Sequence, residues 1–173
     1  MHKIFFSERG FTLVEMLVVI MLVGILAAAA IIGINPVGQI AKSNDAHRKS
    51  DLASIQRALE LYYQDTGSYP ASSADYKIYI NATPKAWGTS WSPYMSTLPK
   101  DPSATNTYIY YSPVSGSGQT YYLYANIQTK ADKQACNKSD ACVSLTQGVP
   151  GFPTSNACGG ICNYGVSSPN VSP

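Results

Sequence analysis

A single carboxylate interrupts the long apolar stretch near the start of the chain. The segment SERGFTLVEMLVVIMLVGILAAAA begins at Ser7 and contains Glu15, and the nineteen positions from Met16 to Ile34 carry no charge. As an α-helix, such a run spans about 28 Å, close to the ~30 Å hydrocarbon core of a bilayer. A carboxylate there costs roughly 2.5–3.5 kcal/mol at the bilayer centre and less near an end. Glu15 therefore needs a partner, or a position at the interface, that offsets this cost.

Four cysteines form the second group of residues that could do chemistry. They lie in the last forty residues of the chain, at Cys136, Cys142, Cys158 and Cys162. An even number of cysteines after a membrane helix favours two disulfides, and of the three possible pairings we expect the local ones, Cys136–Cys142 and Cys158–Cys162. The spacings Cys-x5-Cys and Cys-x3-Cys fit a zinc site poorly, so we expect no metal bound to them.

Charge and histidine content argue against nucleic-acid binding and catalysis. The net charge is +2 and only 13% of the residues are charged, so no basic face marks nucleic acid as the main partner. The sequence has no glycine-rich phosphate loop or HExxH pattern, and no nucleophile motif accompanies His2 or His47. The cysteines lack a neighbouring histidine for thiol catalysis. We therefore expect a protein that is not an enzyme and holds no cofactor.

The first part of the chain predicts a membrane segment with its N-terminus in the cytoplasm. Residues 1–10 are polar and include Lys3 and Arg9. Cationic flanks of a membrane helix stay on the cytoplasmic side. The apolar helix predicted for residues 11–34 then crosses the cytoplasmic membrane once, which places the rest of the chain outside the cytoplasm.

A second, amphipathic helix is predicted for residues 35–67, after a kink introduced by Pro36, which lacks a backbone donor. Its apolar stripe recurs at steps of three and four residues, at Leu52, Ile55, Leu59 and Tyr62. Charged residues at helical spacing are expected to pair on the exposed face: Asp45 with Lys49, Arg48 with Asp51 and Arg57 with Glu60. Gly67 is a stop signal for this helix.

The pattern changes to that of strands in the second half of the chain. Aromatic and β-branched runs at residues 76–80, 107–112 and 121–127 have strand length, and SPVSGSGQT between the last two predicts a hairpin loop. We therefore expect an α+β protein in which a small antiparallel sheet, within a globular domain of residues 68–127, packs on the apolar stripe of the second helix. Residues 128–173 predict a loop-rich tail held by disulfides.

Three interpretations of the opening segment compete. A secretory signal peptide could be cleaved after the alanines at residues 27–30, but an acidic residue and more than fifteen apolar positions are unfavourable for it. A plain single-pass anchor for an external domain would place Glu15 near the interface. The third interpretation starts from the stretch RGFTLVE itself.

RGFTLVE is similar to the processing site of type IV pilins and of their relatives, the type II secretion pseudopilins. In the resemblance, Gly10 matches the residue before the cut, Phe11 the new N-terminus and Glu15 the glutamate at the fifth mature position. The resemblance implies that a prepilin peptidase removes Met1–Gly10 as a leader on the cytoplasmic side and methylates the amine of Phe11. The family proline at the twenty-second mature position is replaced by Ile32 here.

The resemblance also implies a role for Glu15 in assembly. Cleavage leaves a cationic amine on Phe11, about 6 Å along a helix from Glu15. When subunits pack helix to helix, Glu15 of one can meet the amine of its neighbour and set the axial register of a filament. Pairing with the amine of its own chain is geometrically harder and stays open.

The second half resembles the major pseudopilin of type II secretion systems. RALELYYQDTGSYP and YMSTLPKDP match its helix end and the segment before its strand pair. The implied function is that of a filament subunit in protein secretion, with further copies, minor pseudopilins, prepilin peptidase and a membrane assembly platform as partners. The alternative is a true type IV pilin for adhesion, motility or DNA uptake, the one case in which nucleic acid would be a partner.

The tail departs from that resemblance. Major pseudopilins typically close with an Asp- and Gly-rich loop that binds calcium, whereas this chain has only Asp132 and Asp140 after residue 101. Calcium takes six to eight oxygen ligands, often from several carboxylates. We expect no calcium, although backbone carbonyls and asparagines could supply ligands, and the cysteines are more similar to the disulfide loop of true pilins.

Overall fold

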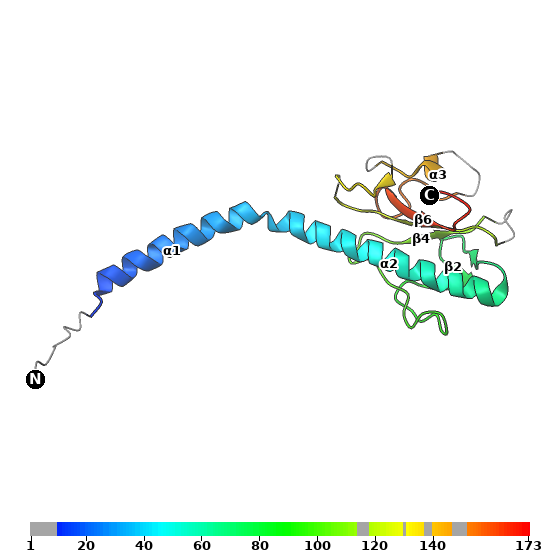
Figure 1. Cartoon of the computed structure of the whole chain (residues 1–173), viewed down its shortest axis with the longest axis horizontal. Helices are drawn as coiled ribbons and strands as arrows, with labels where there is room; N and C mark the ends of the chain where they lie inside the picture. The colour runs from blue at the N-terminus through cyan, green and yellow to red at the C-terminus, as the bar shows by residue number, and fades with distance from the viewer. Residues whose placement is uncertain (1–9, 114–117, 130, 137–139, 147–151) are drawn as a thin grey trace, which may run out of the picture. The chain divides into compact units, whose positions relative to one another are not determined.

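The structure is a computed structural model that describes residues 10–113, 118–129, 131–136, 140–146 and 152–173 (Figure 1). Residues 1–9, most of the predicted leader, lie outside the described part. The chain forms two compact units, an N-terminal unit of residues 1–39 and a C-terminal unit of residues 40–173. Each unit is described by itself.

The N-terminal unit consists of a long apolar helix and the break that follows it. Helix α1 covers Leu13–Ile34, and the side chain of Thr12 caps it by accepting a hydrogen bond from the backbone N–H of Glu15 at 3.2 Å. The helix ends at Asn35, whose φ of 46° lies in the left-handed region. Helix α2, Pro36–Thr66, starts directly afterwards, because proline suits the first position of a helix. The predicted break is therefore confirmed, at a single residue.

Helix α2 carries the apolar stripe that the spacing predicts. Leu52, Ile55 and Leu59 are completely buried in the core of the C-terminal unit. The helix ends where Gly67, with a φ of 74°, donates its N–H to the carbonyl of Tyr63 at 2.8 Å. The amphipathic helix and its stop signal are thus confirmed.

In the described part of the C-terminal unit, α2 is accompanied by six short strands and one short helix. The strands β1 (Ala71–Ser72), β2 (Ile78–Ile80) and β3 (Thr83–Pro84) form one antiparallel sheet, and β4 (Ile109–Tyr111), β5 (Tyr122–Ala125) and β6 (Tyr164–Ser167) form a second, with α3 at Val143–Thr146. The three predicted strand runs all contain strands, but the run 76–80 belongs to the first sheet and the other two to the second. β4 and β5 pair antiparallel on either side of the predicted hairpin loop.

The sheet β4-β5-β6 is covered on both faces (Figure 1). Side chains alternate across a strand. Accordingly Tyr110 and Leu123, which are paired in register, join the core formed with α2, while the neighbouring pair Ile109 and Tyr124 faces the cysteines of the tail. The predicted packing of the sheet on α2 is confirmed, and the burial of both faces explains why the strand runs are apolar or aromatic throughout.

The tail contains the two predicted disulfides and one unpredicted strand. Cys136 is bonded to Cys142, and Cys158 to Cys162. β6 lies in the part of the chain expected to be loop-rich, and it pairs along β5 from Tyr122 to Ala125. The tail is therefore an integral layer of the C-terminal unit.

Candidate functional site

Helix α1 presents apolar side chains to solvent on all its sides. Leu13 is 81% exposed, and Ile20 and Leu26 are each 69% exposed. The nineteen residues Leu13–Ile31 have a mean hydropathy of 2.7, and none of them is buried within the structure. A helix that is apolar all round requires lipid or other helices around it. Among the described residues this is the helix that is long and apolar enough to cross a membrane.

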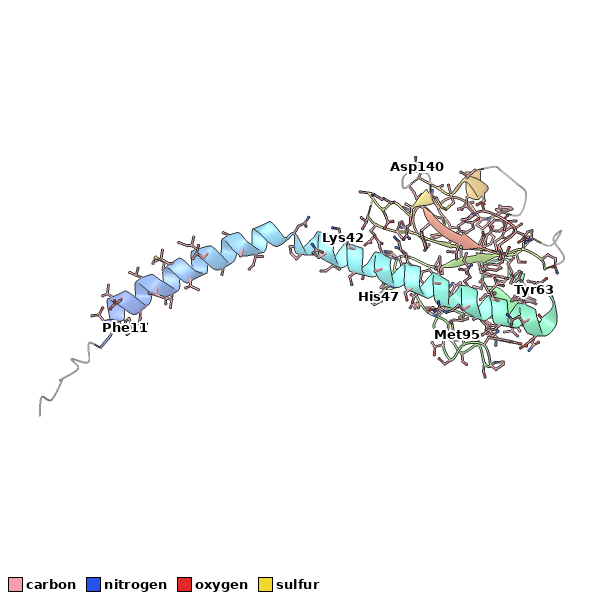
Figure 2. All side chains as sticks on the ribbon, in the orientation of Figure 1. Phe11, Lys42, His47, Tyr63, Met95 and Asp140 are labelled. Carbon is pink, nitrogen blue, oxygen red and sulfur yellow. A yellow bond between two sulfur atoms is a disulfide. The ribbon has the colours of Figure 1, made fainter. Side chains whose placement is uncertain are left out.

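Phe11 lies just before the start of this helix (Figure 2). Glu15 is in the first turn and is the charged residue of α1, where the helix macrodipole favours an anion. Its carboxylate makes no hydrogen bond or ion pair to any other described residue, whereas its backbone N–H is bound by Thr12. Gly10 and Phe11 precede the helix and are exposed, with 72% of Phe11 accessible. The predicted processing and assembly residues thus lie within six consecutive positions on an open surface.

Residues with small side chains follow one another in the middle and second half of α1. A Cβ atom added to Gly24 would meet no atom within 4 Å, so nothing in the chain itself occupies the space beside it. Ala27–Ala30 follow one turn later. Small residues let the backbones of neighbouring helices approach closely in a membrane. This part of α1 is therefore suited to helix–helix contact.

A buried ionic cluster attaches α2 to the rest of the C-terminal unit. Arg48 donates from Nε and Nη2 to the two carboxylate oxygens of Asp101, at 2.8 and 2.9 Å, and from Nη1 to Asp45 at 2.9 Å. The side chains of Arg48 and Asp101 have no exposed area. Burial alone would lower the pKa of Arg48, but the two carboxylates, Asp101 foremost, raise it above its ordinary value.

Asp45 extends the cluster to the segment that follows β5. It accepts hydrogen bonds from the backbone N–H groups of Gln128 and Thr129, both at 2.8 Å. Burial raises the pKa of Asp45, but hydrogen bonds from Thr129, Gln128 and Arg48 outweigh it and hold the pKa below its ordinary value. The carboxylate therefore stays charged and keeps its donors in place.

The three ion pairs predicted along the exposed face of this helix are wrong, because none of them forms among the described residues. Asp45 and Arg48 are buried and pair with each other, while Lys49 reaches Asp132 in the tail at 2.5 Å. The carboxylate of Asp51 accepts from the hydroxyl of Tyr108 at 2.6 Å. The reason is that the sheet and the tail supply partners with better geometry than exposed neighbours on the helix surface can offer.

Glu60 and Arg57 likewise find other partners. Glu60 accepts from the hydroxyls of Tyr69 and Tyr121, whereas Arg57 donates to Ser54 at 2.8 Å. Burial first, and then the neighbouring carboxylate, raises the pKa of both tyrosines above its ordinary value. These tyrosines therefore act as neutral donors that fasten the turn after α2 and the residue before β5 to Glu60.

Of the two histidines, His2 lies outside the described residues. His47 lies on the exposed face of α2 (Figure 2). Across the described ranges, no three His, Cys, Asp or Glu side chains gather in a group that could hold a metal ion. The described residues thus offer an exposed apolar surface on α1 and a C-terminal unit with a buried ionic cluster.

Comparison with known proteins identifies the class to which these features belong. Residues 6–31 match the Prokaryotic N-terminal methylation motif, a span that contains Gly10, Phe11 and Glu15. Together with the exposed apolar helix, this match defines a prokaryotic protein that is anchored in a membrane through its N-terminal helix.

The family itself follows from the rest of the chain. Residues 35–141 match the family described as Type II secretion system (T2SS), protein G. The chain belongs to this family, whose members are structural pseudopilins. The resemblance found in RGFTLVE and LPKDP is thereby confirmed.

The alignments with individual relatives span between 58% and 69% of this chain. The chain is 31% identical over 104 residues to the type II secretion system core protein G of Pectobacterium carotovorum, which is 58% of this chain and 65% of that protein. It is 31% identical over 110 residues to the Escherichia coli protein of the same name, 62% of this chain and 74% of the relative. It is 32% identical over 124 residues to the Pseudomonas aeruginosa protein of the same name, which is 69% of this chain and 82% of the relative. No solved structure matches the chain.

Proposed function

We propose that the chain is a filament subunit of a type II protein secretion system, assembled from the cytoplasmic membrane through its N-terminal helix. The observation that carries the proposal is Glu15, a carboxylate that has no partner among the described residues and lies in the first turn of an otherwise apolar and exposed helix. The match to the protein G family over residues 35–141 supports secretion over adhesion or DNA uptake as the role of the filament.

Processing at the start of the chain would create the partner that Glu15 needs. A prepilin peptidase cleaves between Gly10 and Phe11 and methylates the new amine, which makes Phe11 the first residue of the mature subunit. The amine of one subunit then meets Glu15 of its neighbour when their α1 helices pack side by side. An ion pair of this kind in low dielectric is costly to break, so it sets the register between subunits.

The other partners follow from the family. The subunit inserts with its N-terminus in the cytoplasm and the C-terminal unit outside, and further copies and minor pseudopilins extend the filament on a membrane assembly platform. Its contribution is mechanical, and the chain itself catalyses no reaction. The buried cluster around Arg48 supports this role, because a rigid C-terminal unit transmits force without deforming.

The N-terminal end of the protein recovered from membranes tests processing. We expect the intact mass and the N-terminal sequence to show a chain that starts at methylated Phe11. A chain that still starts at Met1 would favour a plain membrane anchor. A chain that starts after Ala28 or Ala30 would identify a secreted domain and contradict the proposal.

A pair of substitutions at Glu15 tests assembly. Glu15→Ala and Glu15→Gln should both leave membrane insertion intact, because they remove a charge from an apolar segment, yet reduce the filaments that can be sheared from cells. Breaking a buried ion pair costs about 3–5 kcal/mol, which corresponds to a loss of at least about a hundredfold. Asp140→Asn, at an exposed position of the C-terminal unit, is the control and should assemble. Normal filaments from Glu15→Ala would contradict the pairing.

A further inference from the structure

The tail covers one face of the sheet β4-β5-β6 with a core that contains sulfur. Cys142, Cys158 and Cys162 have no exposed area, and they pack with Ile109 and Tyr124 of the sheet. Leu145 of α3 and Phe152 complete this layer. The disulfides therefore form the centre of the layer.

Backbone hydrogen bonds join the two disulfide loops to each other and to the sheet. The N–H of Cys142 donates to the carbonyl of Cys162 at 3.0 Å, and that of Cys136 donates to Asn163 at 2.7 Å. The carbonyl of Cys158 accepts from Thr107, just before β4, at 3.0 Å. Opening either loop would thus release contacts made by the other.

The donor set of the tail does not fit the calcium ion that the family resemblance implies. Asp132 uses one carboxylate oxygen for Lys49, at 2.5 Å, and the other for the N–H of Gln134, at 2.8 Å. Asp140, the other carboxylate of the tail, is exposed at the periphery of the C-terminal unit (Figure 2). A calcium ion needs six to eight oxygen ligands. Of the two tail carboxylates, Asp132 is already neutralised by Lys49.

We propose that the two disulfides replace calcium as the lock that holds the tail on the sheet, and that the chain is a substrate of a thiol–disulfide exchange protein. In each exchange a cysteine pair gives up two electrons and two protons and forms one S–S bond. The disulfide of the exchange protein accepts them and becomes two thiols. Only the place of this oxidation, outside the cytoplasm, rests on the proposed function.

Thermal unfolding of the full chain in detergent micelles separates the two kinds of lock. The oxidised protein is melted with calcium chloride and with a calcium chelator, and we expect the same Tm in both. Reduced protein, and the double variants C136A/C142A and C158A/C162A, should melt about 5–10 °C lower, because each removes a constraint on the unfolded chain. The unreduced mass should be four hydrogens below that of the reduced chain, because two disulfides form.

A rise in Tm of more than about 5 °C on adding calcium to the oxidised protein would overturn the proposal. A reduced protein with the same Tm as the oxidised protein would also overturn the proposal. D132N/D140N is the control for the calcium arm, since it removes both carboxylates of the tail and should leave the response to calcium as flat as in the unaltered chain. The calcium arm needs no cysteine variant, so the test holds even where a variant fails to fold. Filament assembly plays no part in it.

Discussion

Arg48 and Asp101 are joined by two parallel hydrogen bonds inside the C-terminal unit, although 53 positions separate them in the chain. Both side chains are fully buried. Charged groups out of water are stable only when paired, so each of these residues depends on the other. The contact fixes α2 against the LPKDP segment, residues 98–102. Asp45, which also binds Arg48, accepts a hydrogen bond from the segment after β5.

Removing Arg48 should therefore destabilise the C-terminal unit strongly. In R48A two buried carboxylates lose their partner, and we expect the free energy of unfolding to fall by about 3–5 kcal/mol. Urea denaturation followed by tryptophan fluorescence measures it. R57A is the matched control, because Arg57 is exposed and bonds only locally to Ser54, and it should cost about 0.5 kcal/mol or less. Equal effects would show that the buried cluster does not hold α2.

Two leucines on nearly opposite faces of α2 test the apolar stripe. Leu59 is completely buried, whereas Leu61 is 50% exposed. L59A should lower the free energy of unfolding by about 2–5 kcal/mol, because it leaves a cavity in the core. L61A should change it by about 0.5 kcal/mol. The same denaturation experiment measures both, and a larger loss for L61A would place the sheet on the wrong face of the helix.

Two glycines with left-handed backbones test the packing of the tail. Gly159 has a φ of 80° and Gly67 a φ of 74°, so alanine is strained at both positions, by about 1–2 kcal/mol. At Gly159 the added Cβ would also overlap the carbonyl oxygen of Thr105, whereas at Gly67 it would meet nothing within 4 Å. G159A should therefore lose about 1–3 kcal/mol more than G67A. Comparable Tm values for the two variants would contradict this close approach.

The buried tyrosines predict a loss of stability in alkali. Burial first, and then the carboxylate of Asp51, raises the pKa of Tyr108 above its ordinary value of 10.0. Above that pH the unfolded chain loses this proton while the folded chain keeps it, so the folded state binds more protons and its stability falls as pH rises. Each such tyrosine contributes a slope of about 1.4 kcal/mol per pH unit.

Unfolding measured between pH 9 and 12, a range of about one unit below to two above the ordinary tyrosine pKa, tests this slope. Y108F should be less stable at neutral pH, because it loses the bond to Asp51, but its stability should decline less steeply in alkali. L61A is the control, since it removes a half-exposed side chain that does not titrate and should leave the slope unchanged. Identical slopes for all three proteins would contradict the assignment.

Much of the architecture could be predicted because it depends on neighbours in the sequence. The stripe of Leu52, Ile55 and Leu59 follows from helical spacing, and the break after α1 from Pro36. The disulfides close loops with separations of six and four residues, so the local pairing was the favourable one. The strand β6 was missed because its four residues, YGVS, have little strand character away from β5.

Local spacing alone determined the apolar helix with Glu15 in its first turn and the amphipathic helix, and it favoured the local disulfide pairing without excluding the other two. Each of these depends on residues a few positions apart, which the order of the chain brings together by itself. The tertiary structure alone decided the partners of the charged residues. On a helix surface Arg48 is spaced equally well for Asp45 and Asp51, and only folding of the LPKDP segment over α2 brings Asp101 to it. Burial then makes that distant pair the stronger one, because charges removed from water bind the partner with the best geometry.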